Sequence, residues 1–256
     1  MNESSIVLNT PIAVLSYQTK HRKTYDTLCL LKANGYSHVH VYATPLTYQK
    51  RRFPLVQHRP SFVYDIPETR DLCGNFVFAY SECAVNELDI AKNELVLVAG
   101  AGILPDDFVA SHTIINAHPG YIPNCRGLDA LKWAIVEDQP IGVTTHLLGK
   151  YVDAGCVIER VRIPVYENDT FHSVACRVYE NEIYMLVRAV ELVRHTEALQ
   201  YIEPAEFQVH RRMPETVEKI LFERFEEYKT KHVEELSSNW GGNGLIFAAS
   251  LKKEAA

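Results

Sequence analysis

Short apolar runs that alternate with stretches of helical periodicity are the feature that most constrains how this chain folds. The clearest run, 95–99, is followed by Gly100, Ala101 and Gly102. A run of this length, bounded by glycine, is typical of a strand buried on both faces of a parallel sheet. The other runs that we expect to form strands are 11–15, 38–42, 76–80, 113–116, 141–148 and 156–165. Their alternation with helices predicts an α/β fold with a doubly wound parallel sheet.

The stretches between these runs predict helices and one long irregular segment. Apolar residues recur with the helical period in 24–34, in 83–93 and, most regularly, in 171–195. The segment 44–67 is aromatic, basic and interrupted by proline, so we expect a loop or lid there. Glu182 falls on the apolar stripe of the long helix. It is compatible with a buried carboxylate bonded to a nearby loop, or with support for a functional site.

The last part of the chain has a different character. A short strand is expected within 201–209, and an amphipathic helix is expected to begin near Pro214, which suits a first turn. A turn followed by an apolar patch occupies 240–247. We therefore expect a core of residues 1–200 and a C-terminal extension of residues 201–256, helical with short strands, which is a candidate dimer contact.

Composition argues against several classes of protein. The net charge is −6 and 47% of the residues are hydrophobic. This supports a full core and argues against a nucleic-acid surface, because phosphate binding needs a basic field. The six cysteines are scattered without the spacing of a zinc site, so we expect reduced thiols and no metal. We find no leader typical of secretion and no apolar run of the roughly 18 residues that span a membrane. We expect a cytoplasmic protein.

Three polar side chains lie at or beyond the ends of predicted strands, where open α/β sheets collect ligands. Asn116 and His118 are two residues apart, so on an extended segment they face the same side. Asp153 follows the next β-rich run. A carboxamide supplies N–H donors, an imidazole can donate, accept and titrate near neutral pH, and a carboxylate can orient the imidazole. Together they suit direct attack of an amine or water on a carbonyl, without a covalent enzyme intermediate.

The same residues also fit a plain turn, in which the asparagine only satisfies backbone groups. Two sequence blocks favour the chemical interpretation. The first is NAHPGYIP at 116–123, with Arg-Gly at 126–127; the second is GVTTH at 142–146, seven residues ahead of the Asp-Ala-Gly that begins at Asp153. These blocks, in this order and at this spacing, resemble the signature of the folate-dependent N-formyltransferases. The similarity covers about 95–195, is weak before it and is absent after about residue 209.

The resemblance implies a Rossmann-like, mostly parallel core with helices on both faces. This core would bind 10-formyltetrahydrofolate, or its 5-formyl analogue, and pass the formyl group to a primary amine. By the family's pattern, Asn116 polarises the formyl oxygen and His118 acts as general base or as a cationic partner of the oxyanion. Asp153 holds His118 and relays protons through water. His146, in the second block, is either a supporting group or simply a hydrogen-bonded strand histidine.

The family's pterin pocket implies a set of folate contacts. The pocket is lined by the segment that matches 98–105 and by the loop before the aspartate, here 149–153. A pterin ring needs a flat apolar pocket with backbone hydrogen bonds, and glycine permits close backbone approach. The contacts that we expect are Gly100, Gly102, Ile103, Leu104, Val152 and Asp153.

Departures from the family narrow the choice of amine. Members that act in purine synthesis carry a glycine-rich loop after the first strand for the substrate phosphate, whereas the matching loop here, 16–23, has no glycine. Members that act on initiator tRNA carry a basic C-terminal barrel, whereas residues 204–256 are few and balanced in charge. These departures leave the nucleotide-linked amino-sugar N-formyltransferases as the group that this chain resembles most.

We therefore expect an enzyme that formylates the primary amine of a nucleotide-linked amino sugar, such as a dTDP- or GDP-linked 4-amino-4,6-dideoxyhexose. The product would serve lipopolysaccharide O-antigen or another surface polysaccharide. We expect a homodimer without nucleic-acid or membrane partners. Two alternatives remain: formylation of another small amine, such as an amino acid or a siderophore precursor, and a folate- or nucleotide-binding protein without turnover.

The diphosphate of such a sugar could meet a set of basic residues, and Tyr17 or Tyr121 could stack on its base. Each cation fits solvated surface charge better than a ligand contact. The set is Lys20, Arg22, Lys23, Lys50, Arg51 and Arg52.

Overall fold

The computed structural model describes residues 9–46, 52–60, 65–149, 155–195, 200–201 and 208–234. Its centre is an eight-stranded sheet with the order β3-β2-β1-β4-β5-β7-β8-β9. The strands from β3 to β5 in this order are parallel, and β7, β8 and β9 each run antiparallel to the strand before. This confirms the predicted α/β fold with a mostly parallel sheet. The strands are β1 Ile12–Tyr17, β2 Val39–Thr44, β3 Ala79–Glu82, β4 Leu95–Val98, β5 Thr113–His118, β7 Gly142–Leu147, β8 Cys156–Arg162 and β9 Gln200–Tyr201.

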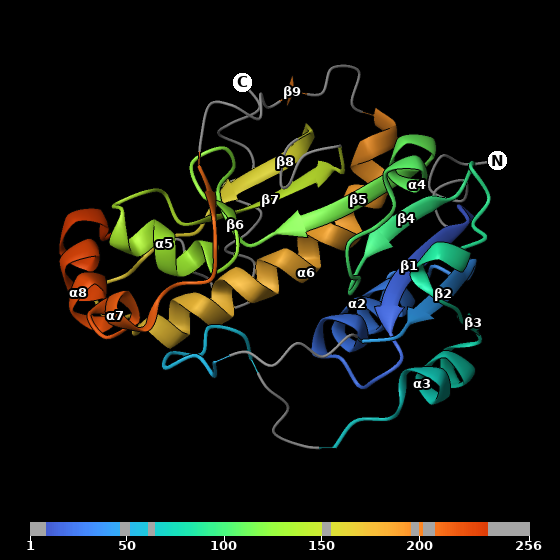
Figure 1. Ribbon diagram of the computed structural model, residues 1–256, viewed down its shortest axis with the longest axis horizontal. Helices are drawn as coiled ribbons and strands as arrows, with labels where there is room; N and C mark the ends of the chain where they lie inside the picture. Colours follow the sequence, from blue (N-terminus) through green and yellow to red (C-terminus); the bar gives the residue numbers. More distant parts are fainter. Residues whose placement is uncertain are drawn as a thin grey trace.

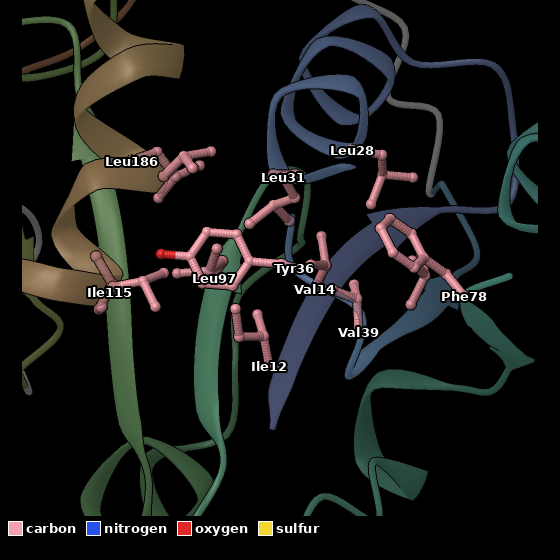
Figure 2. Packing of buried hydrophobic residues seen from close by; sticks show 14 of the residues in the cluster. Ile12, Val14, Leu28, Leu31, Tyr36, Val39, Phe78, Leu97, Ile115 and Leu186 are labelled. Carbon is pink, nitrogen blue, oxygen red and sulfur yellow. The ribbon is translucent and has the colours of Figure 1, made fainter. Parts of the chain in front are cut away.

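Helices cover both faces of this sheet (Figure 1). On one face, α2 and α6 pack over alternate side chains of β1, β2, β4 and β5; Figure 2 shows Leu31 and Leu186 of these two helices directed toward the strands. On the other face, α4 contributes Phe108 to a second apolar cluster. None of the helices in the described ranges is both long and apolar enough to cross a membrane. The helices are α2 Arg22–Ala33, α3 Thr69–Phe76, α4 Asp106–Ser111, α5 Ala130–Val136, α6 Phe171–His195, α7 Glu215–Glu218 and α8 Leu221–His232.

Local structure differs from the sequence predictions in three places. The run 76–80 begins as the end of α3, and Val77 closes that helix in the left-handed conformation, so β3 starts only at Ala79. The helix predicted at 83–93 is wrong, since only a single 3-10 turn forms there, Val85–Glu87. The helix predicted from Pro214 is split into α7 and α8. In each case the apolar pattern predicts one regular element, whereas the chain breaks that element with a turn or an irregular stretch.

The described C-terminal residues pack against α5 rather than standing apart from the core. β10 (Val209–His210) pairs with β6 (Arg126–Gly127). The His210 ring stacks on Trp133 of α5 with a centroid distance of 4.9 Å. Apolar residues of α8 share a cluster with α5 and α6, and Figure 1 shows α5, α7 and α8 gathered at one end of the sheet. The boundary at residue 200 stays a prediction, and the apolar patch at 240–247 lies outside the described residues.

A buried ion pair fastens α7 to α5. The side chains of Lys132 and Glu218 are fully buried, and Nζ lies 2.5 Å from Oε1. The other carboxylate oxygen accepts from Arg52 Nη2 at 2.5 Å and from the Leu55 backbone N–H at 3.0 Å. Burial opposes ionisation, yet the hydrogen bonds from Lys132 and Arg52 lower the pKa of Glu218 to about 2. The C-terminal segment is therefore held to the core through charge as well as apolar contact.

Removing one member of this pair should destabilise the protein, because the other charge stays buried. We expect Lys132→Met to lower the free energy of unfolding by about 3 kcal/mol, measured by urea denaturation. The matched control is Lys219→Met, which removes an exposed pair with Glu215 in the same segment and should cost less than about 1 kcal/mol. Equal losses in the two variants would contradict this account.

Candidate active site

The polar residues of β5 lie on the face of the sheet opposite α6. Side chains alternate along a strand, and Ile115 and Ala117 belong to the cluster beneath α6. Ile114 belongs to the cluster on the other face, so Asn116 and His118 face that side too. The order of connection reverses between β1 and β4, and β4 lies next to β5. Ligands of open α/β sheets bind at the carboxyl ends of such strands.

Asn116 lies beside a histidine of the adjacent strand, β7. Antiparallel pairing places it opposite His146 of β7, and Asn116 Nδ2 lies 3.4 Å from His146 Nε2. With Nε2 as acceptor, His146 carries its proton on Nδ1, which lies 3.3 Å from the Leu147 carbonyl oxygen. Asn116 Nδ2 has a second hydrogen to offer. This contact favours the supporting role for His146, which orients a carboxamide that can still donate to a ligand.

His118 is anchored by one ring nitrogen. The residue is 4% exposed, and its Nε2 lies 2.9 Å from the Cys125 carbonyl oxygen. Since a carbonyl only accepts, Nε2 carries a proton in both charge states of the ring. In the neutral ring, Nδ1 is therefore the nitrogen that carries the lone pair.

The turn after β5 is held from the neighbouring strands. The buried Thr144 hydroxyl donates to the Gly120 carbonyl at 2.9 Å and accepts from the Ile122 N–H at 3.0 Å. Arg160 of β8 donates to the Ile122 carbonyl at 3.2 Å. A Cβ on Gly120 would lie 2.6 Å from His118 Nε2, so no side chain fits there. Thr144 was present in the second sequence block without an assigned role, and Cys125 acts through its backbone, which no side-chain pattern reveals.

The third residue of the expected constellation cannot be placed beside these two. Asp153 and Val152 lie outside the described residues, so the contact between Asp153 and His118 stays a prediction. In the part of the chain that is described, no three or more His, Cys, Asp or Glu side chains gather in a way that could hold a metal ion. Of the residues expected here, those that the structure describes supply a carboxamide and two imidazoles.

The segment after β4, where folate contacts are expected, has a closed and an open part. A Cβ on Gly100 would lie 2.8 Å from the Tyr17 ring, so packing inside the protein explains this glycine. The Tyr17 hydroxyl donates to the Ala101 carbonyl at 2.7 Å, and burial raises the Tyr17 pKa. Gly102 has no neighbour within 4 Å of a Cβ, and Ile103 is 97% exposed. Leu104 packs on the cluster that contains Phe108. The open part, 102–103, can meet a ligand.

The described members of the basic set are engaged with carboxylates of the protein itself. Lys20 lies 2.6 Å from Asp65, Arg22 2.6 Å from Asp26, Lys23 2.8 Å from Glu182 and Arg52 2.5 Å from Glu218. Lys50 and Arg51 lie outside the described residues.

The two tyrosines expected to stack on a base are also in use. Tyr17 braces the loop after β4, and the Tyr121 ring has Arg160 and Arg162 at 5.2 and 5.5 Å from its centre. The geometry therefore does not favour the assignment of these cations and rings to a sugar nucleotide.

Filling the space beside His118 should disturb the ring. We expect Gly120→Ala to destabilise the protein by roughly 1–3 kcal/mol through overpacking and to shift the NMR signal of the His118 Nε2 proton. Gly74→Ala in α3 meets nothing within 4 Å and should instead stabilise by roughly 0.5–1 kcal/mol. An unchanged His118 signal in Gly120→Ala would show that the ring does not depend on this contact.

Comparison with known proteins places this geometry in a family. The model of the formyl transferase family matches residues 21–190. Phosphoribosylglycinamide formyltransferase of Escherichia coli (strain K12) is 30% identical over 115 residues, which are 43% of this chain and 54% of that relative. The chain thus spans about half the length of that curated relative.

Two solved structures show the same fold. A sugar N-formyltransferase from Shewanella sp FDAARGOS_354 superimposes with a TM-score of 0.54 at 18% identity, covering 84% of this chain and 87% of that one. HypX from Aquifex aeolicus, solved in complex with tetrahydrofolic acid, gives 0.52 at 20% identity and covers 81% of this chain and 30% of that one. Since the family model covers more than half of the sequence, including both blocks around Asn116 and His146, this chain belongs to the formyl transferase family.

Proposed function

We propose that this protein transfers a formyl group from 10-formyltetrahydrofolate to the primary amine of a nucleotide-linked amino sugar. The observation that carries the proposal is the placement of Asn116 and His118 side by side on one face of β5, at the carboxyl edge of a formyl transferase fold. HypX, a structural neighbour, was solved with tetrahydrofolic acid. The open segment 102–103, which follows the adjacent strand β4, supports a folate at this position.

The two side chains have complementary roles in the proposed transfer. The acceptor amine attacks the formyl carbon, and negative charge develops on the formyl oxygen. The Asn116 N–H that does not bind His146 donates to this oxygen, and such a donor contributes about 3–4 kcal/mol to catalysis. His118 Nδ1 takes the proton that the amine loses and returns it to the departing nitrogen of the folate, so the ring ends unchanged. Asp153 is expected to relay protons through water beside this ring.

The choice of acceptor rests on two observations that point in different directions. The fold resembles a sugar N-formyltransferase over 84% of this chain, whereas the Escherichia coli relative named above acts on phosphoribosylglycinamide and favours that acceptor as a second candidate. Against the second candidate, the loop after β1 has no glycine, and its Lys20 already binds Asp65. We therefore favour the amino sugar, with a product used for lipopolysaccharide or another surface polysaccharide, and a homodimer in the cytoplasm.

A panel of acceptors separates these candidates. The protein is incubated with 10-formyltetrahydrofolate and, in separate reactions, dTDP-, GDP- and UDP-linked 4-amino-4,6-dideoxyhexoses, phosphoribosylglycinamide and ornithine. We expect mass spectrometry to show one added formyl group on an amino sugar. Formylation of phosphoribosylglycinamide or ornithine alone would overturn the sugar assignment, and no product from any acceptor would overturn the transferase proposal.

The roles of the two β5 residues can be tested directly. We expect Asn116→Ala and His118→Ala each to lower kcat about a hundredfold or more, because a donor to the oxyanion or the proton acceptor is lost. Release of tetrahydrofolate, followed by absorbance, measures the rate. Asn124→Ala is the control: this asparagine lies in the same turn but binds Gln139, and its kcat should stay within about twofold. Near-normal turnover in both β5 variants would remove these roles.

A further inference from the structure

Glu182 is a fully buried carboxylate that the proposed reaction does not use. It lies on α6, beneath the strand that carries Asn116 and His118, and its side chain is 1% exposed. It accepts from Lys23 Nζ at 2.8 Å and from the Arg59 guanidinium through both carboxylate oxygens. Burial alone would raise its pKa, but the charges of Arg59 and Lys23 lower the pKa to about 2. Glu182 is therefore an anion that holds two cations. The sequence left open a loop contact or active-site support, and Arg59 is the loop contact.

Lys23 connects the Glu182 carboxylate to β5, the strand that carries Asn116 and His118. The residue lies in the first turn of α2, and its Nζ is 3.4 Å from the Ala117 carbonyl oxygen. Ala117 lies between Asn116 and His118, so this carbonyl belongs to the backbone that joins them. The pairing of β4 with β5 ends at Ile115. Beyond that point the ammonium group of Lys23 supplies a contact to β5 that the ladder with β4 does not.

The groups around Lys23 make its position depend on Glu182. His21 precedes α2, and burial together with the charges of Lys23 and Arg59 lowers its pKa to about 4, so it is neutral near pH 7. Asp26 faces Arg22 and the Tyr179 hydroxyl, at 2.6 and 2.7 Å. Without the carboxylate, the largely buried Lys23 and the partly exposed Arg59 would be two like charges with no anion between them, and repulsion would separate them.

We propose that Glu182 is a positioning residue for formyl transfer, which holds Lys23 against the Ala117 carbonyl and so fixes the spacing of Asn116 and His118. A carboxamide and an imidazole that act on one reacting group must keep their relative positions closely, because a displacement of about 1 Å can cost a hundredfold in rate. The inference rests on the roles proposed above for these two side chains. It predicts that a change at Glu182 lowers kcat only because Lys23 is displaced.

A double-mutant cycle tests the connection. Glu182→Gln keeps the shape of the side chain and removes its charge, and Lys23→Met removes the ammonium group. We expect each to lower kcat about tenfold or more while the KM for 10-formyltetrahydrofolate stays within about twofold. The double variant should be no slower than Lys23→Met, because Glu182 acts through Lys23. Lys23→Arg keeps the charge and should recover part of the lost rate.

Arg59→Met is the matched control for a purely structural effect. It removes the other cation of the same carboxylate and leaves the contact between Lys23 and Glu182. We expect a loss of stability in thermal denaturation comparable to that of Lys23→Met, with kcat within about twofold of the unsubstituted protein. If Glu182→Gln does not fold, the comparison of Lys23→Met with Arg59→Met still decides, since equal losses of kcat would overturn the positioning role.

The outcomes separate this inference from the function on which it rests. Near-normal kcat in Lys23→Met and Glu182→Gln, with Asn116→Ala inactive, would overturn the positioning role and leave the proposed function intact. Losses that multiply in the double variant would show that Glu182 does not act through Lys23. Full turnover in Asn116→Ala and His118→Ala would instead remove the function itself.

Discussion

The alternation of side chains along β5 is the constraint on which the site depends. Ile115 and Ala117 are buried beneath α6, so the pleat turns Asn116 and His118 to the opposite face. A slip of one residue in register would turn the polar pair toward α6 and turn Ile115 and Ala117 toward the opposite face. The free energy of burying the apolar face therefore determines where the polar side chains point. Packing of Ile115 and Ala117 in the core therefore also determines on which side of the sheet Asn116 and His118 lie.

Hydrogen bonds to backbone groups hold His118 and the turn that follows β5. His118 is anchored by the carbonyl of Cys125, and the turn between them is fastened by the Thr144 hydroxyl and by Arg160. These partners come from β7 and β8, which run antiparallel to their neighbours at the end of an otherwise parallel sheet. The antiparallel extension thus braces the turn that carries the imidazole and places His146 opposite Asn116.

Charge in the interior is organised in small compensated groups. Glu182 holds Lys23 and Arg59, and Glu218 holds Lys132 and Arg52. Each carboxylate joins a helix to a segment distant in the sequence, because a buried charge needs a partner close by. Lys23 and Arg52, which the sequence presents as candidate phosphate ligands, are therefore paired with carboxylates of the protein itself.

Most of the strands and the common side of Asn116 and His118 were predictable from the sequence, and the contacts that orient these two side chains were not. Buried strands such as β4 and β5 are recognisable in the sequence as apolar runs. A motif singles out Asn116 and His118, and the two-residue period of a strand places them on one side. The run 83–93 has apolar residues at helical spacing, yet only a 3-10 turn forms, because single residues such as Ile90 reach the core from an irregular chain. Local pattern alone cannot distinguish these cases.

The sequence alone thus determined the α/β class, the strand that carries Asn116 and His118, and the common side on which these two side chains lie. It did so because periodicity and motif are local properties, written within a few residues. Tertiary structure alone decided that Lys23 meets Ala117, that Cys125 anchors His118 and that the basic residues of the first loop bind carboxylates. Those contacts join segments separated in sequence, and only packing brings such segments within hydrogen-bonding distance.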